Sequence, residues 1–383
     1  MKAHTKYFSI AAAVIAVFLG SCTPDGGSIY FILENEVEQP PSTLGSNITV
    51  FDVARLGDTY YAAANTIFQG AISGTNVTWI SDGESNPLRT LPRSDARCNA
   101  LAAFGVNLFG GFRTDSENIG LWMAAGSDFT TAGGGIEVTA AELQNQEIIR
   151  LKVSSDGTRL LIISASPTGV AATPFNYCLT AYNGGYTQLI TAADGITKMI
   201  RDADYNPAGL GTYYAVSGNN MYSGAGPLVP NNVLGGYTIG EANTLQGIQS
   251  DGTNIIVSSK SGGIYVSVDS GANWTNLAAE IQLGTAVSYL GISGPLAGSG
   301  NYIIGSEAYG YSYLKPPYTA LVRSADTSMK TLKLYGAVIL RFYVDSLQEP
   351  DTVFACTSGY SLWKANIDAA NDSGVATSTW LIQ

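Results

Sequence analysis

Short apolar runs separated by small or polar turn residues recur along most of the chain. One pair of runs is TYYAVSGNNMYSGA around Tyr214, and another is TNIIVSSKSGGIYVSV, which ends at Val268. Two runs joined by such a turn predict a β-hairpin. Seven pairs are found, and the second run of each carries an aromatic marker: Phe68, Trp122, Tyr182, Tyr222, Tyr265, Tyr313 and Trp363.

The aromatic markers repeat with a mean spacing of about 49 residues between Phe68 and Trp363. A further apolar run precedes each hairpin and a fourth follows it, so each repeat predicts four antiparallel strands. Radial repetition of such sheets is typical of a β-propeller. The predicted fold is therefore all-β, a β-propeller of four-stranded antiparallel blades, most consistent with seven blades. Six or eight blades stay open as alternatives because the second and third repeats are irregular. No sustained helical periodicity follows the N-terminal apolar run.

The first 22 residues follow a different pattern. Residues 1–6 carry two lysines, an uninterrupted apolar run extends from Tyr7 to Leu19, and Leu19-Gly20-Ser21-Cys22 closes it. An apolar run this short does not span a bilayer, which needs roughly 20 residues, so residues 1–21 are predicted to be a signal peptide. The four closing residues resemble the lipobox of bacterial lipoproteins. The resemblance implies that Cys22 becomes the lipidated N-terminus; a cleaved signal followed by a chance cysteine is the alternative.

Residues 22–45 form an acidic, proline-containing segment that we interpret as a lipidated tether, in which residues 29–33 can form one short strand. The composition is uniform over residues 46–383, which predicts one propeller domain there. No later segment is long and apolar enough to span a membrane. The expected location is therefore the bacterial cell envelope, with the chain anchored by lipid on the periplasmic face or at the cell surface.

Charge and composition limit the kinds of partner and of functional site that we expect. The chain has 19 basic and 30 acidic residues, a net charge of −11, and loss of the leader's two lysines leaves 17 against 30, or −13. Such a surface repels nucleic acid. The only histidine is His4 in the leader, so we predict no imidazole metal site, no histidine-dependent catalysis and no cofactor. Cys98, Cys178 and Cys356 allow at most one disulfide, and buried free thiols are the favoured interpretation.

The segment SVDSGANW has the spacing S-x-D-x-G-x-x-W. It resembles the Asp box, or bacterial neuraminidase repeat, of sialidase, sortilin-type and other exported propellers. The resemblance implies a structural turn on the face opposite the ligand site, formed by Ser267, Asp269, Gly271 and Trp274. A carboxylate that accepts loop amides, a glycine that allows positive φ and an indole that packs on the blade suit that role. Residues 371–380, NDSGVATSTW, look like a degraded second copy.

The catalytic signature of the sialidases is missing. Those enzymes combine an early Arg-Ile-Pro motif with an arginine triad, a Tyr/Glu nucleophile pair and an acid/base Asp. The chain has no Arg-Ile-Pro, and Leu91-Pro92-Arg93 does not replace it. We therefore predict that the protein is not an enzyme, with glycan-active catalysis as the minor alternative.

Four arginines fall in the predicted first strands of four blades, which line the central channel of a propeller. Arg97, Arg150, Arg201 and Arg341 therefore form a candidate ligand-binding channel mouth for an anionic or carboxylate-bearing group. The favoured alternative is that each arginine pairs with a neighbouring acid and satisfies a narrow polar channel.

Together these patterns predict a lipid-anchored, non-catalytic β-propeller that acts as a protein-binding scaffold or adhesin-like module in the cell envelope. The expected partner is an envelope or extracellular protein. The alternative is a glycan-binding or glycan-active propeller that takes an anionic glycan at the arginine-lined mouth. The membrane is contacted through the lipid anchor only, and nucleic acid is not a partner.

Overall fold

The structure is a computed structural model, and it describes residues 44, 48–64, 66–73, 76–79, 91–125, 129, 135–144, 146–170, 173–207, 211–278, 281–282, 285–297, 299–307, 309–323, 334, 337–348, 351–359, 361–367 and 380–383. The predicted signal peptide, Cys22 and the short strand at residues 29–33 lie outside these residues and stay predictions. Contacts divide the chain into two units. The propeller belongs to the unit of Pro41–Ile281 and Ala286–Gln383, and residues 282 and 285 are the described part of the other.

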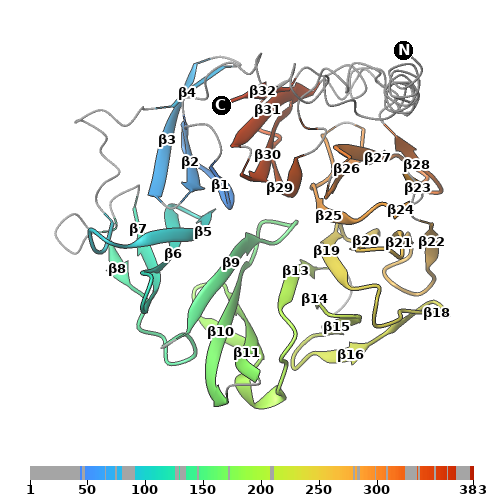
Figure 1. The fold of residues 1–383 in the computed structure, drawn as a ribbon, viewed down its shortest axis with the longest axis horizontal. Coiled ribbons are helices and arrows are strands. Elements are labelled where there is room, and N and C mark those ends of the chain that lie inside the picture. Colours follow the sequence, from blue (N-terminus) through green and yellow to red (C-terminus); the bar gives the residue numbers. More distant parts are fainter. Residues whose placement is uncertain are drawn as a thin grey trace, which may run out of the picture. The chain divides into compact units, whose positions relative to one another are not determined.

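Seven four-stranded antiparallel sheets follow one another along the chain and are arranged radially (Figure 1). This confirms the predicted all-β propeller and its count of seven blades. Blades one to three contain β1 (Asp52–Leu56), β2 (Thr59–Ala64), β3 (Thr66–Ser73), β4 (Asn76–Trp79), β5 (Arg97–Phe104), β6 (Asn107–Arg113), β7 (Asn118–Ala124), β8 (Ile136–Glu137), β9 (Glu147–Val153), β10 (Leu160–Val170), β11 (Thr173–Tyr182) and β12 (Tyr186–Ile190).

Blades four to seven contain β13 (Ile200–Asn206), β14 (Thr212–Ser217), β15 (Asn220–Gly224), β16 (Val229–Asn231), β19 (Leu245–Ser250), β20 (Ile255–Ser259), β21 (Ile264–Ser267), β22 (Thr275–Leu277), β25 (Tyr289–Ile292), β26 (Tyr302–Ser306), β27 (Tyr311–Leu314), β28 (Leu321–Arg323), β29 (Val338–Asp345), β30 (Asp351–Ser358), β31 (Leu362–Ile367) and β32 (Leu381–Ile382). Two short ribbons, β17 (Val233–Leu234) with β18 (Tyr237–Thr238) and β23 (Ile281–Gln282) with β24 (Thr285–Ala286), complete the strands. The 3₁₀ helix η2 (Ala192–Asp194) is the one helix among the described residues. None of the described part of the chain forms an apolar helix of membrane-spanning length.

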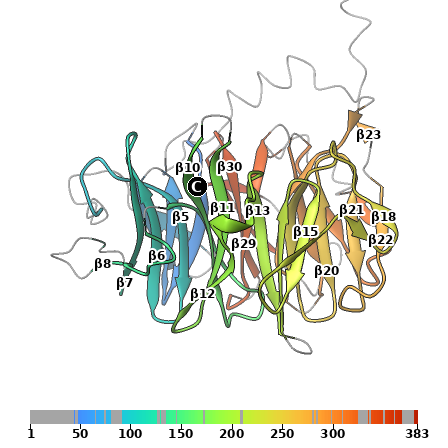
Figure 2. The same ribbon diagram turned by 90° about the horizontal axis from the view of Figure 1, so that it is seen from below.

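The first strand of each blade lies innermost. Contacts join β1 to β5, β5 to β9, β9 to β13, β13 to β19, β19 to β25 and β25 to β29, and β29 contacts β1, so the ring is closed. Each aromatic marker of the sequence lies in the third strand of its blade, as Tyr222 does in β15 and Trp363 in β31. Figure 2 views the ring from the side, where strands such as β13 and β20 run between its two edges.

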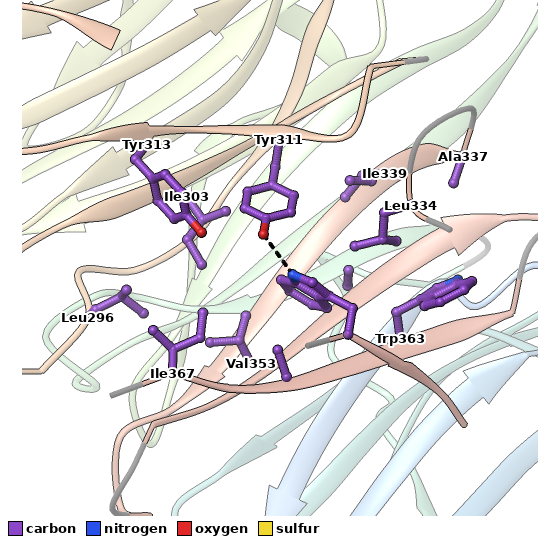
Figure 3. Close-up of a cluster of buried hydrophobic side chains, with 13 residues drawn as sticks. Leu296, Ile303, Tyr311, Tyr313, Leu334, Ala337, Ile339, Val353, Trp363 and Ile367 are labelled. Carbon is purple, nitrogen blue, oxygen red and sulfur yellow. Dashed lines mark hydrogen bonds between the residues drawn. The ribbon is translucent and has the colours of Figure 1, made fainter. Parts of the chain in front are cut away.

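Large side chains fill the space between neighbouring blades. Between blades six and seven the indole nitrogen of Trp380 donates a hydrogen bond of 2.9 Å to the hydroxyl of Tyr311, the dashed line in Figure 3. Ile303, Ile339 and Val353 surround this pair, and all are fully buried. Each blade thus buries its faces against its neighbours, which is why no single blade needs a core of its own.

The first and last blades are joined by polar contacts as well. The backbone amide of Val50 donates to the carbonyl of Thr357 at 3.1 Å. The carboxylate of Asp345, at the end of β29, accepts hydrogen bonds from Arg55 Nη1 (2.6 Å) and the hydroxyl of Tyr60 (2.5 Å). Leu44, within the predicted tether, is itself buried against these two blades.

Candidate functional site

A cavity of about 630 Å³, here called the mouth cavity, opens where the first strands of blades three to seven begin. It is lined by Phe51, Ile149, Arg150, Met199, Ile200, Arg201, Asp202, Ala242, Thr244, Gln246, Lys260, Leu290, Gly291, Glu307, Leu340 and Arg341. Its volume is within the usual range for small-molecule and peptide side-chain sites.

β-Bulges in the innermost strands shape this cavity. In blades three, four, five and seven one residue of the first strand has no partner on the second: Ile149, Arg201, Gln246 and Leu340 respectively. All four line the mouth cavity. A bulge re-aims the side chain at its site and interrupts the strand's alternation. The same register break in four blades therefore directs four side chains to one opening.

Two of the predicted arginines follow a bulge directly and form ion pairs on the cavity wall. Arg150 Nη1 lies 2.9 Å from Asp202 Oδ1 and donates to the carbonyl oxygen of Arg201 at 2.8 Å. Arg341 Nη1 pairs with Asp52 of the neighbouring blade one. Burial lowers the pKa of Arg150, and the charge of Arg341 adds to that effect. These two arginines fit the pairing interpretation, with acids supplied by adjacent blades.

Beneath the mouth, a second cavity of about 260 Å³ follows the inner strands and shares Arg150 and Arg341 with it. Lys152 Nζ lies there, 3.3 Å from Asp202 Oδ1 and 2.7 Å from the carbonyl oxygen of Ile248. Burial raises the pKa of Asp52, and the neighbouring Arg341 charge opposes the rise. The channel below the mouth is thus a network of paired charges that holds neighbouring blades together.

Arg201 differs from the other arginines at the mouth. It is exposed, and its guanidinium has no ion pair or hydrogen bond with any residue that the structure describes. Lys260 and Glu307, at the ends of the second strands of blades five and six, are also exposed at the cavity edge. Sequence reasoning missed these two residues, although the hairpin turns that follow them mark the same edge of the ring.

Arg97 lies apart from the other three arginines. It is the first residue of β5, is exposed, and pairs with Asp115 at 2.9 Å. It lines neither the mouth cavity nor the smaller one. The bulge of blade two falls at Asn99, two residues later, so Arg97 is not equivalent to Arg201. The structure brings three of the four candidates together.

The charged residues that line the mouth cavity carry a net positive charge, opposite in sign to that of the whole chain. Four cations, Arg150, Arg201, Lys260 and Arg341, face two acids, Asp202 and Glu307. These six residues carry a formal charge of +2, whereas the whole chain carries −11. A cationic concavity in an acidic protein concentrates negative charge at that point.

Residues 267–274 form a closed turn at the other edge of blade five. Asp269 Oδ1 accepts from Ser267 Oγ (2.8 Å) and from the backbone amide of Asn273 (2.8 Å). Gly271 has φ of 91°, and its carbonyl accepts from the Trp274 indole at 3.0 Å. Because β19 begins at the mouth and β20 returns to it, the turn that follows β21 lies at the opposite edge.

Of the degraded copy at residues 371–380, Trp380 alone is described, and it is buried between blades six and seven. Cys98, Cys178 and Cys356 are free and buried, which confirms the interpretation of the cysteines. Burial raises the pKa of all three thiols, so they are unreactive in the folded state.

Comparisons with known proteins establish the fold. No protein-family model and no curated protein matches the chain. YCF48 bound to D1 peptide is similar with a TM-score of 0.53 and 11% identity, over 83% of this chain and 92% of that one. The WD40 propeller of Doa1 gives 0.51 and 12%, over 82% and 91%. An ancestral GH74 enzyme gives 0.60 and 13%, over 90% of this chain and 47% of the enzyme. At these identities the similarity shows a β-propeller and nothing finer.

The two carboxylates that line the mouth cavity differ in how they are engaged. Asp202 is engaged by Arg150 and Lys152 and by the backbone amide of Ile248 at 3.1 Å. The carboxylate of Glu307 has no such engagement with any residue that the structure describes. Glycoside hydrolysis normally needs two available carboxyl groups across the scissile bond. A free guanidinium beside apolar side chains can instead form paired hydrogen bonds with a ligand carboxylate.

Proposed function

We propose that this protein is a lipid-anchored, non-catalytic β-propeller of the bacterial cell envelope that binds a protein partner at the mouth cavity. The observation that carries the proposal is the guanidinium of Arg201, which has no ion pair or hydrogen bond with the described residues and lies in a cationic cavity of a strongly acidic chain. The partner segment presents a carboxylate to Arg201. Lys260 adds a second cation to the lining, whereas Arg150 and Arg341 are paired with Asp202 and Asp52.

Apolar residues around the cations favour a peptide over a lone anion. Ile149, Leu290 and Leu340 line the same cavity and are each partly exposed, so a bound carboxylate would sit beside aliphatic surface. A low local dielectric strengthens the guanidinium–carboxylate interaction. An acidic residue flanked by apolar ones matches both features. The similar propeller YCF48 has been solved with a D1 peptide bound, which supports peptide binding as a role open to this fold.

The envelope location rests on the lipobox resemblance at Cys22. Metabolic labelling of the producing bacterium with tritiated palmitate tests it. We expect label in the wild-type chain and none in a Cys22→Ser variant, with the propeller still folded. Equal labelling of both would refute the anchor but leave the binding site intact.

The binding role is tested with the predicted mature chain, residues 22–383 carrying Cys22→Ser. A random peptide library displayed on phage and an array of neutral and anionic glycans are probed in parallel. We expect acidic peptides to be selected, and their binding to weaken at least tenfold on Arg201→Ala but not on Arg97→Ala. Arg97 is the matched control, because it is an exposed arginine outside both cavities. Binding only to anionic glycans, lost on Arg201→Ala, would replace the protein partner with a glycan.

A further inference from the structure

A third cavity of about 340 Å³ lies beside the mouth cavity. The two share their walls: Lys198 and Glu241 line the third cavity, and the residues that directly follow them, Met199 and Ala242, line the mouth. The same two connections, one before β13 and one before β19, therefore separate the cavities. Both cavities open at the edge of the ring where the first strands start.

An ion pair crosses this wall. Lys198 Nζ lies 2.6 Å from Glu241 Oε2, and both side chains are exposed, so the pair lies on the surface between the two cavities. Gly218 makes room for the lysine, because a Cβ added there would lie 2.4 Å from Lys198 Cδ. The φ of Gly218 is 58°, a conformation that favours glycine. The wall between the cavities is thus a defined structure of blade four.

The third cavity has a different chemistry from the mouth. Lys198 faces two acids, Asp194 and Glu241, so the lining has a formal charge of −1. Asn220 and Tyr222 contribute an amide and a hydroxyl, and burial raises the pKa of that hydroxyl. A second anion is disfavoured here, whereas an uncharged group that forms hydrogen bonds is well accommodated.

The apolar part of this lining favours a peptide residue over a sugar. Leu228 and Pro230 supply aliphatic surface beside the amide of Asn220. Tyr222 is the one aromatic residue of the lining, and its ring packs against the core cluster of blades three and four. Sugar rings are commonly held by stacking on a free aromatic face, and this ring is engaged elsewhere. A residue with a polar backbone and an apolar side chain fits the cavity.

We infer that the mouth cavity and the third cavity are two subsites of one groove for an extended peptide. The acidic residue of the peptide binds Arg201 at the mouth, the chain passes over the Lys198–Glu241 ion pair, and an uncharged neighbouring residue occupies the third cavity. This inference rests on the proposed function, because it places the same peptide carboxylate at Arg201. It adds the direction in which the peptide leaves the mouth, toward blade four.

Isothermal titration of peptides selected from the displayed library tests the inference. Asn220→Ala removes an amide of the third cavity, Lys198→Met removes the cation of the ion pair, and Arg201→Ala removes the mouth guanidinium. We expect the first two to weaken binding three- to tenfold and the third at least tenfold. Shortening the peptide at the end remote from its acid should abolish the sensitivity to Asn220→Ala and Lys198→Met while the sensitivity to Arg201→Ala persists.

The outcomes separate the two proposals. Loss of binding on Arg201→Ala alone, with the other two variants unchanged, overturns the two-subsite groove and leaves the proposed function standing. If none of the three variants changes the affinity for the peptide, both proposals are overturned. Selection of glycans only, with sensitivity to Asn220→Ala, overturns the peptide class. Thermal melting of each variant checks the fold, and Arg97→Ala is the surface control.

Discussion

The contact between the first and last blades offers a test of how this ring is held closed. Asp345 is buried, with 2% of its side chain exposed, and its carboxylate accepts from Arg55 (2.6 Å), Tyr60 (2.5 Å) and the backbone amide of Leu347 (3.1 Å). Asp345→Ala leaves a largely buried guanidinium and a buried hydroxyl without this acceptor. Breaking a buried ion pair by removing one partner costs about 3–5 kcal/mol.

Residual contacts of Arg55 set the expected value within that range. Its Nε still donates to the carbonyl of Gly57 at 2.8 Å, and Asp58 lies 3.6 Å away. We therefore expect Asp345→Ala to lower the free energy of unfolding by about 3 kcal/mol. Tyr60→Phe removes one hydrogen bond to a charged group and should cost about 1.5 kcal/mol.

Urea unfolding followed by tryptophan fluorescence and far-UV circular dichroism measures these changes. Asp115→Ala is the matched control, because its pair with Arg97 is exposed on both sides, and we expect a change within about 0.5 kcal/mol. In the Asp345→Ala background, Tyr60→Phe should cost almost nothing, since the hydroxyl has already lost its acceptor. A loss for Asp345→Ala no larger than that for Asp115→Ala would refute the reasoning.

Three further predictions concern the turn at the opposite edge and the core. Gly271→Ala should lower the free energy of unfolding by about 1–3 kcal/mol through backbone strain, because φ at this position is 91°. Sterics add little, since the new Cβ would lie an ordinary 3.4 Å from its nearest atom, Ile255 Cδ1. The control Gly185→Ala, where a Cβ meets no atom within 4 Å, should leave the free energy of unfolding unchanged. A hydrogen bond from the backbone amide of Asn273, with others in the turn, holds the pKa of Asp269 below 3.8. Because the folded-state pKa is lowered, the ionised carboxylate stabilises the folded state above the unfolded pKa, and this stabilisation is lost as the carboxylate is protonated at lower pH. The difference in unfolding free energy between wild type and Asp269→Asn should therefore narrow below pH 3.8; a constant difference would contradict this. The three propeller thiols are buried and should react with Ellman's reagent only after unfolding; rapid reaction of the native chain would show that a blade opens.

The architecture was accessible from the sequence because one position repeats in every blade. The third strand needs an aromatic or large residue to pack between blades, and its recurrence from Phe68 to Trp363 marked seven sheets. Strand alternation also assigned the arginines to innermost strands. These are local properties, and each repeat displays them independently of its neighbours.

The composition of the site was less accessible, for two physical reasons. A bulge shifts the alternation by one residue: Arg201 is itself bulged and lines the mouth, whereas Arg97 lies two positions before the bulge at Asn99 and does not line it. Ion pairs also join blades that are distant in sequence, as between Asp52 and Arg341. No local pattern shows which acid a given arginine meets once the ring has closed.

The central claim is that the mouth cavity binds an acidic partner through Arg201. The most direct test is isothermal titration of the tightest selected acidic peptide into the wild-type mature chain, the Arg201→Ala variant and the Arg97→Ala variant. The account predicts at least a tenfold loss of affinity, about 1.4 kcal/mol, for Arg201→Ala and none for Arg97→Ala. Equal affinity of wild type and Arg201→Ala, or equal losses in the two variants, would contradict it.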